Sequence, residues 1–144
     1  MEPQDRRTFI RTVSTLGVVG LFSLTGIGCG KQDPVSPDYS GLSGTVDVNL
    51  DDHPALLQEG TAISVGGTNL GRPLIITHTT DGYYALDSFC THAGCTVQAG
   101  STLNCPCHGS QFSLTGSVRQ GPATQKLKSF QITQEGNLLT VTLG

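Results

Sequence analysis

Two short segments rich in cysteine and histidine lie close together in this chain of 144 residues. Residues 90–95 read Cys-Thr-His-Ala-Gly-Cys, and residues 105–110 read Cys-Pro-Cys-His-Gly-Ser. Four of the five cysteines and two of the four histidines therefore fall within nineteen positions. Thiolates and imidazoles are the side chains with which proteins bind zinc and iron–sulfur centres. The pattern predicts a metal or redox site built from both segments.

Three chemistries fit these residue types and spacings. Two cysteines and two histidines could bind Zn²⁺ in a tetrahedral site. Four cysteines could instead form two structural disulfides, if the protein is exported to an oxidising compartment. The third chemistry is an iron–sulfur cluster with both cysteine and histidine ligands. The residue types leave all three open.

The two segments closely resemble the two boxes of the Rieske [2Fe–2S] protein family, nearest to its quinol-oxidising cytochrome bc and b6f subunits. They match the family patterns C-T-H-x-G-C and C-P-C-H-G-S in the same order, with Ala93 where a Leu is common. The resemblance implies that one iron is bound by thiolates and the other by ring nitrogens. These ligands would be Cys90 and Cys105 for the first iron, and His92 and His108 for the second. Such ligation places the reduction potential of the cluster in a range of about −150 to +300 mV.

The resemblance also implies a disulfide between Cys95 and Cys107, which would join the two cluster-binding loops. A short disulfide-closed loop contributes on the order of 3 kcal/mol in the chain-entropy estimate. Gly94 and Gly109 would let the backbone turn tightly and bring amide N–H groups towards sulfur atoms. Such hydrogen bonds favour the reduced, more negative cluster.

Several further positions match the family more loosely. Ser110 matches a serine whose hydroxyl donates to a bridging sulfide. Phe112 stands where the members of highest potential carry a Tyr, so we expect a potential below the top of the family range. Gly121 and Pro122 resemble the proline loop that covers the cluster from a third side, although Thr124 replaces a second Pro.

The elements that must position these loops are short strands. Period-two alternation and turn signals at Asp81-Gly82 and at residues 135–137 predict two hairpins that flank the two boxes. The fold is expected to be all-β, a small antiparallel Rieske-type sandwich or barrel with a cluster-binding subdomain formed by two loops. Strands are expected at residues 45–50, 61–65, 74–77, 83–86, 127–133 and 138–143, with one helical turn within residues 52–57.

Composition narrows the functional classes. Nineteen glycines and seven prolines favour turns and short strands over a helical bundle. Eight Lys and Arg against eleven Asp and Glu give a net charge of −3, which argues against a nucleic-acid partner. The length suits one folded domain, and it is too short for the second, mononuclear iron domain of a terminal oxygenase.

The first thirty residues are typical of an export signal. Arg6 and Arg7 precede an uncharged stretch over residues 12–30, an arrangement that resembles the twin-arginine class of bacterial signals. Nineteen helical residues span about 28 Å, just enough for a bilayer core. Cys29 follows small residues that resemble a lipoprotein box. We expect a signal or membrane anchor over residues 1–30, a flexible linker over 31–40 and the folded domain over 41–144.

The resemblance implies an electron-transfer protein tethered at the outer, periplasmic face of a bacterial membrane, with no catalytic activity of its own. It would accept electrons and coupled protons from quinol beside a cytochrome b-like subunit. It would pass the electrons to a c-type cytochrome acceptor within a bc-type complex. An alternative is the small subunit of a periplasmic oxidoreductase, such as an arsenite-oxidase-like molybdenum enzyme. A Rieske ferredoxin and a zinc-binding module fit less well.

Overall fold

The computed structural model of the protein describes residues 36–144, so the predicted signal and the first part of the predicted linker lie outside the described residues. Within that range the chain forms nine β-strands and one 3-10 helix, which confirms the all-β prediction. No helix within it has the length and apolar character needed to cross a membrane. The bounds are β1 Thr45–Asn49, η1 Pro54–Leu57, β2 Thr61–Val65, β3 Leu74–Thr79, β4 Gly82–Asp87, β5 Leu103–Asn104, β6 Gln111–Phe112, β7 Val118–Gln120, β8 Ser129–Glu135 and β9 Leu138–Thr142.

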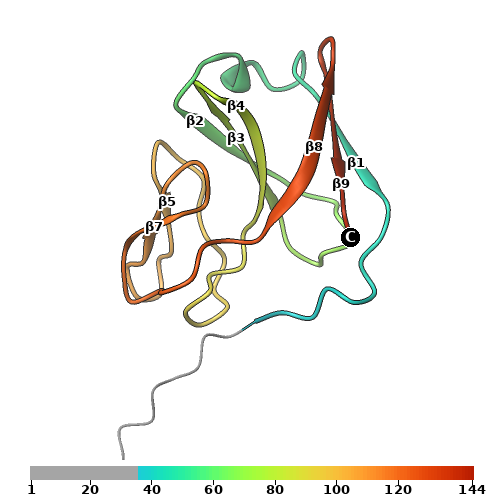
Figure 1. Cartoon of the computed structure of the whole chain (residues 1–144). Helices are drawn as coiled ribbons and strands as arrows, with labels where there is room; N and C mark the ends of the chain where they lie inside the picture. Colours follow the sequence, from blue (N-terminus) through green and yellow to red (C-terminus); the bar gives the residue numbers. More distant parts are fainter. Residues whose placement is uncertain (1–35) are drawn as a thin grey trace, which may run out of the picture. The chain divides into compact units, whose positions relative to one another are not determined.

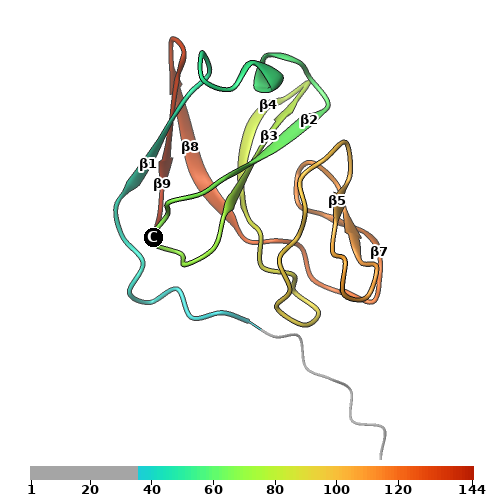
Figure 2. The same cartoon turned by 180° about the vertical axis from the view of Figure 1, so that it is seen from behind.

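Six of these strands form one antiparallel sheet, in the order β1-β9-β8-β4-β3-β2. Figure 1 shows this sheet bending between β8 and β4, so that its two halves face each other as a half-open barrel. A second sheet, β5-β6-β7, forms a smaller subdomain inserted between β4 and β8. Figure 2 shows from behind that this subdomain lies beside β3 and β4, away from β1 and β9. We call it the loop subdomain, residues 88–128.

The first four residues of β3 and the last three of β4 are buried on both faces, because each face packs on a different core. Leu74 and Ile76 point into the core between the halves of the large sheet, whereas Ile75 points into the core of the loop subdomain. Ile75 pairs with Leu86 of β4, which lies on the same face and in the same core. Burial on both faces explains the continuous apolar run at the start of β3, since only a strand with one wet face alternates.

The core of the loop subdomain contains two of the site cysteines. Cys90 and Cys105 are buried among Val97, Leu103 and Phe112. The same apolar packing that attaches the loop subdomain to β3 and β4 therefore also encloses the two free thiols.

Two details differ from the sequence-based expectation. The strand expected over residues 127–133 begins at Ser129, because the N–H of Leu127 donates to Gly116 of the loop subdomain instead of joining the ladder. Leu127 is 1% exposed in that core. The short strands β5, β6 and β7 were not predicted, because two or three residues are too few to show a period.

Replacing Leu86 with Ala is expected to lower the free energy of unfolding by about 2–5 kcal/mol, as for other fully buried leucines. Leu86 is fully buried and joins the large sheet to the loop subdomain. Leu57, which is 59% exposed, is the matched control, and Leu57→Ala should change stability by less than about 0.5 kcal/mol. Denaturant titration of the full chain measures both. Equal losses would contradict this packing.

Candidate iron–sulfur site

The first loop of the site is closed by two backbone hydrogen bonds. The N–H of Cys90 donates to the carbonyl of Cys95 at 2.9 Å, and the N–H of Gly94 donates to the carbonyl of Cys90 at 2.8 Å. Gly94 has φ 75°, in the left-handed region that favours glycine. The tight turn expected at this glycine is confirmed.

The second loop repeats this geometry. The N–H of Cys105 donates to the carbonyl of Ser110 at 2.8 Å, and the N–H of Gly109 donates to the carbonyl of Cys105 at 3.0 Å. Gly109 has φ 77°. Each box therefore starts with a buried cysteine whose N–H and carbonyl are both satisfied within its own six residues.

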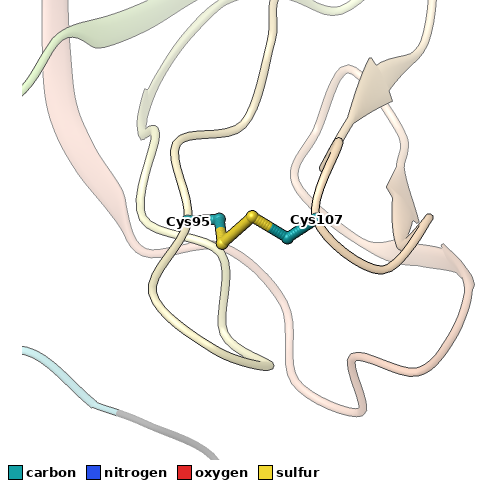
Figure 3. Close-up of a disulfide and its surroundings, with 2 residues drawn as sticks. All are labelled: Cys95 and Cys107. Carbon is teal, nitrogen blue, oxygen red and sulfur yellow. A yellow bond between two sulfur atoms is a disulfide. The ribbon is translucent and has the colours of Figure 1, made fainter. Parts of the chain in front are cut away.

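A disulfide between Cys95 and Cys107 holds the two loops together, as the resemblance implied. Figure 3 shows the bridge running from the end of the first loop to the second loop. Its sulfur atoms are 2.02 Å apart and its residues are separated by twelve positions in the sequence. Neither Cys95 nor Cys107 is therefore free to bind a metal as a thiolate.

The remaining two cysteines of the boxes are free and buried. Cys90 is 0% exposed and Cys105 is 2% exposed. Burial raises the pKa of the Cys105 thiol, and the neighbouring Cys90 thiol raises it further, while backbone hydrogen bonds from Cys107 and His108 act in the opposite direction. Metal binding requires the thiolate, so a positive metal centre would have to offset the burial.

The two histidines of the boxes form a second pair. Their rings lie edge to face, with centroids 4.8 Å apart and an angle of 87° between the planes. His92 buries its Nδ1 atom without a hydrogen-bond partner, whereas His108 is exposed. A metal would satisfy this nitrogen, although the Nδ1 atom of His78, outside the site, is buried without a partner as well. The arrangement thus supplies a thiol pair inside and an imidazole pair towards solvent.

Within residues 36–144, no three Cys, His, Asp or Glu side chains converge on a single metal position. The other two histidines lie outside the site. His53 precedes η1, and His78 of β3 stacks on Tyr83 with centroids 4.3 Å apart.

The segment after β7 is bonded to both loops. The Gly121-Pro122 peptide is cis and exposed, and the following Ala123 donates its N–H to the buried Ser110 hydroxyl oxygen at 2.9 Å. The Thr91 hydroxyl of the first loop donates to the carbonyl of Gln125 at 2.6 Å. The predicted proline loop is thus attached to the first loop through Thr91 and to the second through Ser110.

A buried carboxylate anchors the start of the first loop. Asp87 is fully buried at the end of β4 and accepts the N–H of Phe89 at 2.9 Å. It also accepts two hydrogen bonds from the Arg72 guanidinium, at 2.6 and 2.5 Å, and one from the Tyr39 hydroxyl at 2.7 Å. The charge is therefore paired and the oxygens are fully occupied, as a buried carboxylate requires.

The same ion pair supports the loop through an aromatic ring. Arg72 stacks over Phe89, with its guanidinium carbon 5.0 Å from the ring centroid. The Phe89 ring packs so closely on Gly94 that a Cβ atom there would lie 2.9 Å from the ring. Glycine at position 94 is therefore required both by the backbone angle and by lack of space.

Tyr39, Arg72 and Asp87 were not identified from the sequence as site residues. A usable signal was present at Asp87, since a carboxylate closes an apolar strand three residues before the first cysteine. Burial and the hydrogen bonds to Asp87 raise the pKa of Tyr39, which keeps its hydroxyl protonated as a donor. The Asp87 carboxylate likewise raises the pKa of Arg72.

Comparison with known proteins agrees with this geometry. The profile of the Rieske [2Fe-2S] domain matches residues 49–131. The cytochrome b6-f complex iron-sulfur subunit of Synechococcus sp. (strain JA-3-3Ab) is 30% identical over 94% of this chain and 85% of its own length. That of Synechococcus sp. (strain CC9605) is 31% identical over 83% and 78%. The crystal structure of the plasma membrane Rieske protein PetC3 from Synechocystis PCC 6803 has a TM-score of 0.55 and 30% identity, covering 67% of this chain and 97% of that one.

A half-barrel of antiparallel strands with two disulfide-linked loops, one free cysteine and one histidine in each, defines an iron–sulfur protein of the Rieske type. This chain belongs to the Rieske [2Fe-2S] domain family. It therefore binds a single [2Fe–2S] cluster. Two buried thiols and two imidazoles, one with a buried nitrogen lacking a partner, fit that group.

Gly94→Ala is expected to reduce cluster retention and thermal stability more than Gly109→Ala. Both glycines have positive φ, so either alanine costs about 1–2 kcal/mol in backbone strain. Only position 94 is also crowded, by Phe89, whereas a Cβ at position 109 meets no atom within 4 Å. Iron per chain and the melting temperature of the purified protein measure the difference. Similar effects of the two substitutions would show that Phe89 does not constrain the loop.

Asp87→Asn is expected to lower the free energy of unfolding by roughly 3 kcal/mol, because it leaves the Arg72 charge without its partner. Asp81→Asn removes a carboxylate from an exposed turn and should cost less than about 0.5 kcal/mol. Denaturant titration of both variants provides the comparison. If Asp87→Asn were as mild as Asp81→Asn, the carboxylate would not be the anchor of the loop.

Proposed function

We propose that this protein is an exported, membrane-tethered electron-transfer subunit that oxidises quinol and reduces a c-type cytochrome or similar acceptor. The observation that carries the proposal is the histidine pair at the exposed side of the site, behind which the two thiols are buried. An oxidant of quinol must accept both electrons and protons, and exposed imidazoles beside a redox centre can take up the protons.

The same arrangement supports a particular ligand set. Cys90 and Cys105 would bind one iron as thiolates, and His92 and His108 would bind the other. The buried Nδ1 of His92 would be its iron ligand, and Nε2 would then be free to carry a proton. The bound cluster supplies one-electron transfer. His108, as the exposed member of the pair, is the residue that meets the quinol hydroxyl and accepts its proton.

The surrounding residues tune this site. Ser110 accepts a hydrogen bond from Ala123, so its own hydroxyl proton remains available to donate towards the cluster sulfur. The fully buried Phe112 lacks the hydroxyl that raises the potential in other members of the family. A donor to the cluster favours its reduced form, so this substitution lowers the potential.

The proposed setting is a cytochrome bc-type complex at the outer face of a bacterial membrane. Curated relatives of similar length are named as iron-sulfur subunits of cytochrome b6-f complexes, which supports a cytochrome b-like partner. The PetC3 structure is described as that of a plasma membrane protein. The Arg6-Arg7 pair ahead of an uncharged stretch supports export and tethering by residues 1–30, with a linker ahead of the anchored Tyr39 that lets the head move.

A redox titration of the full-length protein, followed by its visible or EPR spectrum at several pH values, tests the proposal. We expect a potential above zero that falls by up to about 59 mV per pH unit near neutrality, because each proton taken up with the electron adds that slope. A potential at or below that of the quinone pool, flat with pH, would contradict quinol oxidation. It would favour the alternative of a small subunit in a periplasmic oxidoreductase, such as a molybdenum enzyme.

A further inference from the structure

Charged side chains are separated along the long direction of the large sheet. Residues 36–144 carry four Lys and Arg against eight Asp and Glu, a net charge of −4. Arg72 is neutralised by Asp87. The remaining cations of that range are Arg119, Lys126 and Lys128, and all three are exposed.

Five exposed acids lie together at one end of the sheet, which we call the acidic end. They are Asp51, Asp52, Glu59, Asp81 and Glu135.

The strand register brings these acids together. Asn49 at the end of β1 pairs with Leu138, next to the β8–β9 turn, and the Asn137 side chain donates to the Asp51 carboxylate at 2.9 Å. Thr61 at the start of β2 pairs with His78, close to the β3–β4 turn that contains Asp81. Figure 1 shows η1 and the β8–β9 turn at this end, and the site loops at the other.

The three free cations lie at the end that carries the site. Gln120, next to Arg119, donates to the carbonyl of Gly109 in the second loop. Strands β4 and β8 connect the two ends with six and seven residues, which corresponds to about 20 Å at 3.3 Å per residue. The site end is therefore basic, although the domain as a whole is acidic.

Two of the cations line a recess beside the first loop. A cavity of about 570 Å³ is lined by Thr91, Lys126, Lys128, Tyr39 and their neighbours. Lys128 lies over the Tyr39 ring with its Nζ atom 5.5 Å from the centroid, which restricts its orientation. Thr91 precedes the proposed iron ligand His92 directly.

We infer that this lysine recess receives carboxylate side chains of an acidic protein that exchanges electrons at the site. The inference deepens the proposed function and rests on it. Asp38 lines an adjoining hollow that shares Tyr39 with the recess, so its single exposed carboxylate offsets part, but not all, of the charge of Lys126 and Lys128. A membrane surface is a weaker fit, since recognition of anionic lipid takes clusters of about 4–8 basic residues.

Because salt screens distant charges, the charges near the site decide whether a partner is attracted there. At physiological ionic strength the Debye length is about 8 Å, so the acidic end, some 20 Å away, is largely screened from a partner at the site. Lys126 and Lys128 line the recess themselves, so a group bound there is close to both charges. A partner with acidic surface residues is therefore attracted to the site end and repelled from the opposite end.

Binding of a fluorescein-labelled poly-L-glutamate of about twenty residues to the full-length protein tests this directly. Two variants lower the net charge equally: Lys126→Gln changes the recess, and Gln58→Glu changes the exposed surface at the acidic end. We expect Lys126→Gln to weaken binding up to about fivefold, as for the loss of one exposed ion pair, and Lys126→Gln/Lys128→Gln to weaken it further. Gln58→Glu should leave the affinity within a factor of about two.

Three outcomes would overturn the inference. They are equal effects of Lys126→Gln and Gln58→Glu, no binding of the peptide at low salt, and binding to phosphatidylglycerol vesicles in preference to the peptide. Because the anisotropy measurement involves no electron transfer, it is independent of the redox titration. If the redox titration fails and the peptide still binds, only the proposal of quinol oxidation is overturned. If the titration succeeds and the peptide does not bind, only the inference of an acidic partner is overturned.

Discussion

The site geometry depends on the hydrogen-bonded ion pair that the buried Asp87 carboxylate forms. A charge that is buried away from solvent must be paired and fully hydrogen-bonded. Here the two carboxylate oxygens accept hydrogen bonds from Arg72, from the Tyr39 hydroxyl and from the Phe89 amide at the start of the first loop. These partners come from three separate parts of the chain. The pairing thus attaches the residues ahead of β1, the segment ahead of β3 and the first loop to one point at the end of β4.

From that point the two loops are built alike. Each box closes on itself through the amide and carbonyl of its first cysteine, and the disulfide fixes one box against the other. The apolar core of the loop subdomain then buries the two free thiols, while the histidines remain towards solvent. Burial raises the pKa of Cys105, so the site favours a thiolate only when a positive metal centre compensates.

Much of this arrangement could be predicted from the sequence, because the informative signals are local. The boxes predict both cysteine pairs, of which the Cys95–Cys107 bridge is confirmed. Period-two alternation, together with the Asp81-Gly82 turn that follows the apolar run of β3, locates the six strands of the large sheet. The burial of β3 on both faces could not be predicted from the sequence, because a continuous apolar run does not show which residue faces which core.

What the sequence could not reveal depends on contacts between distant residues. Tyr39, Arg72 and Asp87 are spread over nearly fifty positions and meet only in the folded domain. The separation of charge was missed for a different reason: Lys126 and Glu135 are near in sequence, but Lys126 precedes β8 and Glu135 ends it, so the strand holds them apart.

The central claim is that one iron has two thiolate ligands and the other has two imidazole ligands. The Mössbauer spectrum of the oxidised, full-length protein enriched in ⁵⁷Fe tests it most directly, because sulfur and nitrogen ligands give iron different isomer shifts. The account predicts two quadrupole doublets of equal area with distinct isomer shifts. A single doublet, or two with the same isomer shift, would mean that the irons share one kind of ligand and would contradict the assignment of His92 and His108.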